Sequence, residues 1–245
     1  MNESKKVPKI IHYCWFGGKT LPDSAKKCID SWKKYFPDYE IKEWNESNFN
    51  IKCCDYVKEA YQAKKWAFVS DYARFWILYH EGGLYFDTDV EVIRNFDAII
   101  QKGAFMGCEK SEKDLAVNPG LGIGGQPGLD LYREILEYYR NIHFAINSEE
   151  TVVDHTTKIL KRHGWIRNGE IETIENITIY PPEYFCPMNY KTGKITITDN
   201  TYSIHWYTAS WQSSYSRLKT KMQHVLGEKL ANRIIGFKKK IRFSK

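Results

Sequence analysis

The alternation of strand-like and helix-like segments in the first part of this chain constrains its fold more than any other feature. In order, the pattern predicts a strand over 9–16, a helix over 22–35, a strand over 39–44, one or two helices over 55–81 and a strand from Leu84. Such an order is typical of a parallel sheet with crossover helices, whose ligands bind beyond the carboxyl ends of the strands. We therefore expect an α/β fold with its site at that edge of the sheet.

The remainder of the chain continues the mixed pattern. Short strands are expected over 105–108, 120–125, 173–180 and 202–207, and helices over 129–144 and 150–163. A segment over 215–237 has apolar residues at helical spacing beneath a basic face. With 245 residues, of which 42% are hydrophobic, the chain can bury a substantial core. We predict one mixed α/β domain over 1–214 and a basic helical appendage over 215–245.

The charge of the chain is concentrated in this appendage. Residues 215–245 contain ten Lys or Arg and one acid, whereas the rest of the chain sums to −3. A basic amphipathic helix suits an anionic lipid surface, although a packed helix with a solvated tail has the same composition. The six cysteines include no C-x-x-C pair, and neither a secretory signal nor a membrane span is evident. We expect a cytoplasmic protein, peripheral on the inner face of the plasma membrane.

Asp87 and Asp89 form a D-x-D motif after an apolar segment that begins at Gly82-Gly83. In extended backbone, residues two apart point to the same face, so both carboxylates would reach one ligand. Mg²⁺ and Mn²⁺ bind such oxygens together with the phosphates of a substrate. The alternative is an acidic strand end that faces solvent.

Two further positions strengthen a functional interpretation of the motif. Asp71 and Arg74 lie at i and i+3 on one face of the predicted helix, where they would bind hydroxyl and phosphate oxygens. The alternative is a surface ion pair, which contributes little. His205 would add a nitrogen ligand to the two carboxylates, unless it is an ordinary core or surface histidine.

Three blocks of the sequence carry a family resemblance: IIHYCWFGG, SDYARFWILYHEGGLYFDTDVEV and IHWYTASW. They resemble the glycosyltransferases with a DXD sugar-binding motif, family 32, over about Val7 to Trp211, and are more distantly similar to the glucosylating domains of large clostridial toxins. The resemblance implies a GT-A fold, which is Rossmann-like with a mixed, mostly parallel central sheet flanked by helices. It also implies a nucleotide-sugar donor, a divalent metal and retention of the anomeric configuration.

Roles for individual residues follow from the same resemblance. Asp89 would bind the metal, and Asp87 would support the metal and contact the ribose or sugar of the donor. His205 would be the third metal ligand, while Asp71 and Arg74 would bind sugar hydroxyls. Arg74 would also help to stabilise the departing diphosphate, as a bound cation does, so that Asp87, Asp89 and Arg74 form the catalytic set.

The remaining residues of the expected donor site lie on loops and strand ends. Trp15 would stack on a uracil-like base, unless it is a core tryptophan, and Tyr13 belongs to the same donor-binding set. Asn118 would contact the sugar, and Ser210 with Trp211 would close on the diphosphate. The glycines of 120–125 match G-x-G-x-x-G, but they do not connect a first strand to a helix, as a dinucleotide site requires.

These observations predict an enzyme that moves a hexose from a UDP-sugar to a glycan acceptor, which includes lipid-linked glycans, in capsular or surface polysaccharide synthesis, with Mn²⁺ or Mg²⁺ as cofactor. A phosphohydrolase of the haloacid-dehalogenase type would use Asp87 as nucleophile, but it needs a second acidic pair that the later sequence lacks. The basic C-terminus alone would suit a membrane-binding or nucleic-acid-binding module. We expect no nucleic-acid partner.

Overall fold

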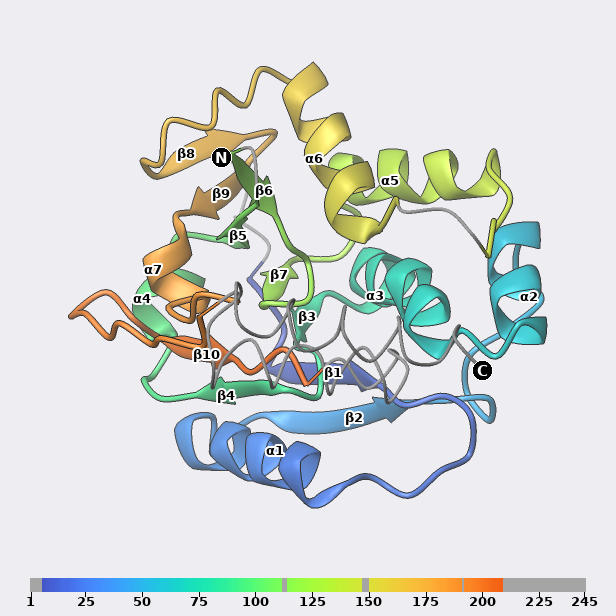
Figure 1. Cartoon of the computed structure of the whole chain (residues 1–245), viewed down its shortest axis with the longest axis horizontal. Coiled ribbons are helices and arrows are strands. Elements are labelled where there is room, and N and C mark those ends of the chain that lie inside the picture. The colour runs from blue at the N-terminus through green and yellow to red at the C-terminus, as the bar shows by residue number, and fades with distance from the viewer. Residues whose placement is uncertain (1–5, 112–113, 147–149, 191, 209–245) are drawn as a thin grey trace, which may run out of the picture.

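The computed structural model describes residues 6–111, 114–146, 150–190 and 192–208 of the chain (Figure 1). Its helices are α1 (Asp23–Tyr35), α2 (Asp55–Gln62), α3 (Trp66–Glu81), α4 (Asp97–Ile100), α5 (Asp130–Arg140), α6 (Val152–Arg162) and α7 (Pro182–Phe185). Its strands are β1 (Ile10–Cys14), β2 (Glu40–Trp44), β3 (Gly83–Tyr85), β4 (Val90–Val92), β5 (Ala104–Lys110), β6 (Leu115–Val117), β7 (Ile123–Gly125), β8 (Glu172–Ile174), β9 (Ile177–Tyr180) and β10 (Ser203–His205).

One mixed sheet runs through the described part of the molecule. Its strand order is β2-β1-β3-β7-β5-β9-β8, and β6 pairs with β5. The pairings give β1, β2, β3, β5 and β9 one direction, and β7 and β8 the opposite one. The predicted parallel arrangement of the first three strands is therefore confirmed, and β7 enters the sheet as an antiparallel neighbour of β3.

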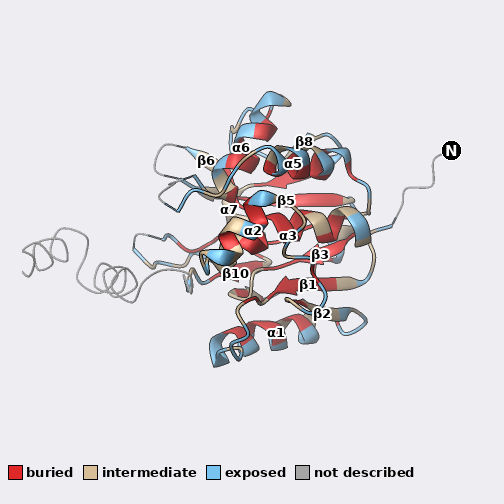
Figure 2. Cartoon of the chain, turned by 90° about the vertical axis from the view of Figure 1, so that its right-hand side faces the viewer, coloured by how far each residue is buried: buried red, intermediate tan, exposed pale blue. Residues whose placement is uncertain are grey.

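Apolar side chains cover both faces of this sheet. Successive strand residues point to opposite faces, so Cys14 and Tyr85 join a core with α2, α3, α5 and α6, whereas Tyr13 and Leu84 join a second core with α1 and β4. Figure 2 shows buried residues concentrated in the strands and in the helix faces that meet them. Helices on both faces leave the strand ends as the place for a polar site.

The structure confirms one expectation about the central segments and corrects another. The one or two helices expected over 55–81 are two, α2 and α3, with Lys64 in left-handed backbone at φ 57° between them. The strand expected from Leu84 to Val92 is interrupted: β3 ends at Tyr85, β4 begins at Val90, and the D-x-D motif lies in a turn between them. The extended-backbone argument for the two aspartates was therefore wrong.

A second, two-stranded sheet places distant residues beside this turn. β10 pairs antiparallel with β4, and His205 is the partner of Val90. The Trp32 indole of α1 donates to the Val90 carbonyl over 2.8 Å, which fixes β4 on the helix. This register brings the end of β10 next to Asp89.

Other sequence expectations stand as follows. All six cysteines are free thiols, in agreement with the absence of a disulfide framework. Across the described helices, no segment combines the length and the apolar character that a membrane span requires. The segment 215–245 lies outside the described residues.

Candidate active site

The D-x-D turn is held by backbone hydrogen bonds. The Asp87 N–H donates to the Gly120 carbonyl over 3.2 Å, and the Val90 N–H donates to the Asp87 carbonyl over 3.0 Å. The turn therefore places both aspartates just beyond the carboxyl end of β3, in the segment that connects β3 to β4. Asp87, Asp89 and His205 each offer a ligand atom, and these atoms lie within 4.8 Å of one another.

Asp89 is bound by the chain that follows β10. His205 Nε2 lies 3.1 Å from Asp89 Oδ1, and Thr208 donates to Asp89 Oδ2 from its N–H over 2.8 Å and its hydroxyl over 3.0 Å. Burial would raise the pKa of Asp89, but His205 and Thr208 outweigh it and lower this pKa to about 2. Burial opposes charge on His205, yet the Asp89 carboxylate outweighs burial and raises the pKa of the imidazole. The Asp89 carboxylate is therefore ionised at neutral pH, the form that can bind a cation.

This group of side chains fits a divalent cation. Two carboxylates and one imidazole are a donor set that suits Mn²⁺ and, through its oxygens, Mg²⁺. The spacing of the three ligand atoms allows one ion to contact all of them. The sequence-based alternatives, a solvent-facing acidic strand end and an unrelated histidine, do not describe this arrangement.

Arg74 connects the D-x-D turn to helix α3. Its Nη2 lies 2.9 Å from Asp71 Oδ1 and 3.3 Å from Asp87 Oδ1, and its Nε donates to the Ser70 carbonyl over 3.2 Å. Tyr85 adds a hydrogen bond from its hydroxyl to Asp87 Oδ1 over 3.1 Å. The Arg74 side chain is only 3% exposed. The interpretation as a surface ion pair is therefore wrong.

The two carboxylates around Arg74 differ from Asp89 in their electrostatics. Burial raises the pKa of Asp71 to about 7, against the opposing effect of Arg74. Burial also raises the pKa of Asp87, and the neighbouring Asp89 adds to that effect, while Arg74 opposes it. The Arg74 cation thus stabilises the ionised forms of both groups in a desolvated position.

Asn118 and Gly120 form the wall behind Asp87. Asn118 Oδ1 accepts a hydrogen bond from the Gly120 N–H over 2.8 Å, and its Nδ2 donates to Glu109 Oε2 over 2.7 Å. A Cβ on Gly120 would lie 2.2 Å from Asp87 Oδ2. The glycine-rich segment 120–125 therefore positions an aspartate, and its end is strand β7, which is not a helix start of the dinucleotide type.

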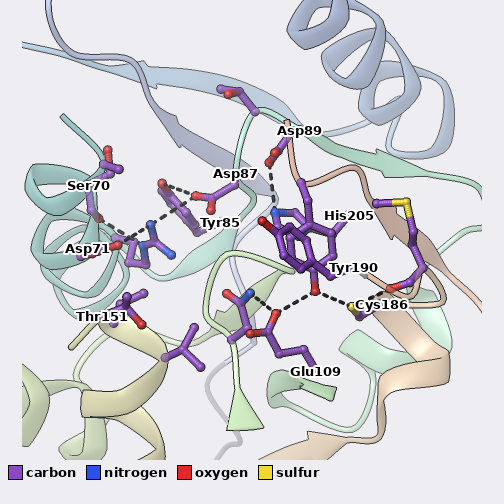
Figure 3. A pocket seen from close by; sticks show the side chains of 18 of the residues that line it. Ser70, Asp71, Tyr85, Asp87, Asp89, Glu109, Thr151, Cys186, Tyr190 and His205 are labelled. Carbon is purple, nitrogen blue, oxygen red and sulfur yellow. Dashed lines mark hydrogen bonds and ion pairs between the residues drawn. The ribbon is translucent and has the colours of Figure 1, made fainter. Parts of the chain in front are cut away.

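These side chains line one open cleft (Figure 3). Its volume of ≈ 1730 Å³ exceeds the roughly 300–1,000 Å³ of an ordinary small-molecule pocket, so there is room for more than one substrate. The residues predicted from the sequence that line it are Trp15, Asp71, Arg74, Asp87, Asp89, Asn118 and His205.

The remaining donor-site predictions have different outcomes. Trp15 is partly exposed at the cleft, where its indole donates to the Lys19 carbonyl, and it also packs against the second core, so both expectations describe part of its environment. Tyr13 does not line the cleft: its hydroxyl donates to Glu43 over 2.7 Å and its ring packs on Trp32. Because side chains alternate along β1, Cys14 faces the cleft and Tyr13 faces the other core. Ser210 and Trp211 lie outside the described residues.

Several cleft residues were not predicted. Glu109 ends the apolar part of β5 and accepts hydrogen bonds from Asn118 and from the Tyr207 hydroxyl. Tyr207 in turn packs edge-on against His205, with ring centroids 4.2 Å apart. An acid at the end of an apolar strand was the available signal for Glu109, the same signal that identified Asp87.

The comparisons with known proteins agree with this geometry. Residues 22–106 match the family described as the glycosyltransferase sugar-binding region containing DXD motif. Inositol phosphoceramide mannosyltransferase 3 of Schizosaccharomyces pombe is 30% identical over 197 residues, which cover 75% of this chain and 52% of the relative. An uncharacterized glycosyltransferase of Acanthamoeba polyphaga mimivirus is 26% identical over 218 residues, 84% of each chain. The chain thus spans about half the length of the fission-yeast relative.

Solved structures give the fold independently. The PaToxG glycosyltransferase superposes with a TM-score of 0.50 at 20% sequence identity and covers 65% of this chain and 70% of its own. The fold is GT-A, as the resemblance implied. Residues 22–106 therefore match the DXD sugar-binding region of a glycosyltransferase family, and the two relatives described above are glycosyltransferases, in agreement with the resemblance and in favour of a glycosyltransferase over a phosphohydrolase.

Proposed function

We propose that this enzyme transfers a hexose from a UDP-sugar to a glycan acceptor, with retention of configuration and with Mn²⁺ or Mg²⁺ as cofactor. The observation that carries the proposal is the convergence of Asp87, Asp89 and His205 within 4.8 Å, from segments more than a hundred residues apart, in a cleft large enough for two substrates. DXD-type glycosyltransferases typically use a divalent metal, and this donor set suits one.

In this proposal, different side chains of the cleft bind the base, the sugar and the diphosphate of the donor. Trp15 offers an indole face to the base, a contact worth ~1–3 kcal/mol. Asp71 and Arg74 bind hydroxyls of the sugar, and Arg74 also fixes the orientation of Asp87. A cation held by Asp87, Asp89 and His205 would supply Lewis-acid stabilisation of the negative charge that develops on the diphosphate.

Retention is proposed to follow front-face attack. The acceptor hydroxyl oxygen bonds to the anomeric carbon on the face that the diphosphate leaves, and the hydroxyl proton passes to the departing diphosphate. The carboxylates nearest the D-x-D turn support this route: Asp71 and Asp87 are engaged by Arg74, and Asp89 by His205 and Thr208. An NMR time course of the product anomer tests retention, since an inverted product excludes this mechanism.

The acceptor is proposed to be a lipid-linked glycan in surface or capsular polysaccharide synthesis, at the inner face of the plasma membrane. Two relatives are named as inositol phosphoceramide mannosyltransferases, so their names describe a lipid acceptor. The basic segment 215–245 supports the proposal, because positive charge attracts anionic lipid.

A panel of UDP-sugars, extended by GDP-mannose because of the named relatives, tests the donor. We expect hydrolysis of one UDP-sugar that requires Mn²⁺ or Mg²⁺, and a loss of at least roughly a hundred-fold in Asp89→Asn. Turnover of GDP-mannose alone contradicts the UDP assignment. Metal-independent turnover contradicts the role of the Asp87, Asp89 and His205 group.

A further inference from the structure

Glu109 has a position in the cleft that the proposed donor site does not use. It lies at the end of β5, and its Oε2 accepts hydrogen bonds from Asn118 Nδ2 over 2.7 Å and from the Tyr207 hydroxyl over 2.8 Å. Its Oε1 accepts no hydrogen bond from the described residues. One carboxylate oxygen is thus fixed, and the other is available to a ligand in the cleft.

The two hydrogen-bond partners of Glu109 connect it to Asp87 on one side and to His205 on the other. Asn118 also accepts the Gly120 N–H, and the Gly120 carbonyl accepts the Asp87 N–H. Tyr207 lies against the His205 ring at 4.2 Å. The free oxygen of Glu109 therefore has a defined location relative to the place where the diphosphate is proposed to depart.

The chemistry around Glu109 is that of a neutral polyhydroxylated ligand. A carboxylate oxygen accepts hydrogen bonds from hydroxyls and repels phosphate. The ring of Tyr190, which is 39% exposed, packs edge-on against Tyr207 with centroids 5.1 Å apart and extends an aromatic surface into the cleft. Aromatic surface beside a hydroxyl-binding carboxylate suits a sugar ring.

Glu109 lies on the other side of Asp87 from Asp71, one of the two residues proposed to bind hydroxyls of the donor sugar (Figure 3). Figure 3 shows Ser70 and Asp71 on one side of Asp87, and Glu109 on the side of Tyr190 and Cys186. The cleft volume of ≈ 1730 Å³ leaves space for a second substrate there. We propose that Glu109, fixed by Asn118 and Tyr207, binds a hydroxyl group of the acceptor glycan, an inference that rests on the proposed function.

Glu109→Gln tests this subsite with little change of shape. Acceptors are p-nitrophenyl and methyl glycosides, and UDP release is measured with and without them. We expect the KM for the best glycoside to rise by roughly ten-fold or more, the cost of a hydrogen bond to a charged group. Hydrolysis of the UDP-sugar without acceptor should fall less than transfer to the glycoside does, so that the variant shows a loss of acceptor use relative to hydrolysis.

Glu183→Gln is the matched control. Glu183 also lines the cleft, and its carboxylate accepts hydrogen bonds from Thr198 over 3.2 Å and Asn200 over 3.0 Å. We expect no change in the KM for glycosides in this variant. An equal rise in both variants, an unchanged KM in Glu109→Gln, or an equal loss of hydrolysis and transfer in Glu109→Gln would each overturn the proposal.

A direct binding measurement separates this proposal from the donor assignment. Saturation-transfer NMR follows methyl glycosides with the wild-type chain in the presence of UDP and Mn²⁺. Saturable binding that weakens in Glu109→Gln supports the subsite even if no UDP-sugar is turned over, an outcome that contradicts only the proposed function. Absence of saturable glycoside binding to the wild-type chain overturns the subsite.

Discussion

The Arg74 guanidinium shares one nitrogen between two carboxylates, Asp71 at 2.9 Å and Asp87 at 3.3 Å. Because the side chains of Arg74 and Asp71 are only 3% and 9% exposed, removal of the cation leaves the buried Asp71 carboxylate without its partner, and Asp87, which is 30% exposed, loses its nearest cation. We predict that Arg74→Met lowers the free energy of unfolding by about 3–5 kcal/mol, as measured by urea denaturation.

A double variant and a surface control make that measurement specific. Asp71→Asn in the Arg74→Met background should restore at least about 1 kcal/mol, since it removes one of the unpaired charges. Arg133→Met breaks exposed pairs with Asp130 and Glu137 and should cost less than about 1 kcal/mol. If Arg74→Met and Arg133→Met cost the same, the buried network has no special role in stability.

Gly120 is required by the position of Asp87. A Cβ at Gly120 would lie 2.2 Å from Asp87 Oδ2, so alanine must displace the carboxylate. We predict that Gly120→Ala weakens Mn²⁺ binding in the presence of UDP by roughly 10–100-fold, as loss of a supporting contact does at metal sites. Calorimetric titration measures the effect. Gly164→Ala, at φ 88° with no atom within 4 Å, is the control for backbone strain alone. Equal Mn²⁺ affinity in Gly120→Ala and the wild-type chain would refute the prediction.

Strand β1 contains a titratable group that joins three strands. His12 is fully buried, with Nε2 3.0 Å from the Gly82 carbonyl before β3 and Nδ1 accepting the Trp44 indole N–H of β2 over 3.1 Å. Nε2 therefore donates and Nδ1 accepts, which is the hydrogen bonding of a neutral imidazole. Burial lowers the pKa of His12 to about 4, although Glu81 opposes the shift.

This shift makes the sheet sensitive to acid. The folded state disfavours the protonated His12 ring. The contribution of His12 to the free energy of unfolding is therefore complete above pH 6.5 and decreases as the pH falls toward 4, by about 3 kcal/mol in all. His12→Gln retains a donor and an acceptor but does not titrate. We expect the free energy of unfolding of the wild-type chain to fall by about 3 kcal/mol more than that of His12→Gln between pH 7 and pH 4. If the free energy of unfolding of the two proteins falls equally with pH, His12 is not the group that makes the folded state sensitive to acid.

The elements that the sequence predicted best are those with a strong local pattern. α1, α3, β1 and β2 follow directly from apolar periodicity. The interruption of the strand after Tyr85 could not be read locally, because it depends on the hydrogen bond from Asp87 to Gly120, a contact between distant residues. Two short elements were also missed: β6 is defined by its pairing with β5, and α4 is a single turn of four residues.

The residues of the candidate site likewise fall into those that lie close together in the sequence, which were predicted, and those brought together only by the fold, which were harder to predict. The D-x-D motif and Arg74 lie in one continuous block, so the sequence predicted them together. His205 was proposed from its residue type and from the resemblance, whereas the pairing of β10 with β4 that brings it to Asp89 is seen only in the structure. Tyr13 was misplaced because one step along β1 reverses the face of the sheet. Glu109 was missed because its partners, Asn118 and Tyr207, come from two other segments.

Charge is divided unevenly over the chain as a whole. Residues 215–245 sum to +9, while the rest, which contains the cleft, sums to −3. Attraction to anionic lipid contributes about 1 kcal/mol per basic residue near the surface. We therefore expect the charge of segment 215–245 to attract the chain to anionic lipid.

Deletion of Phe237–Lys245 removes five of the ten basic residues in that segment. We predict that the full chain sediments with vesicles containing phosphatidylserine but not with pure phosphatidylcholine, and that the deletion weakens binding by roughly ten-fold or more. Salt should weaken the binding of the full chain as well. A charge-matched control replaces five exposed lysines elsewhere with glutamine: Lys9, Lys26, Lys33, Lys58 and Lys102. Equal losses in the two variants would mean that net charge alone drives the binding, and unchanged binding after the deletion would remove the C-terminal segment from the account of membrane attachment.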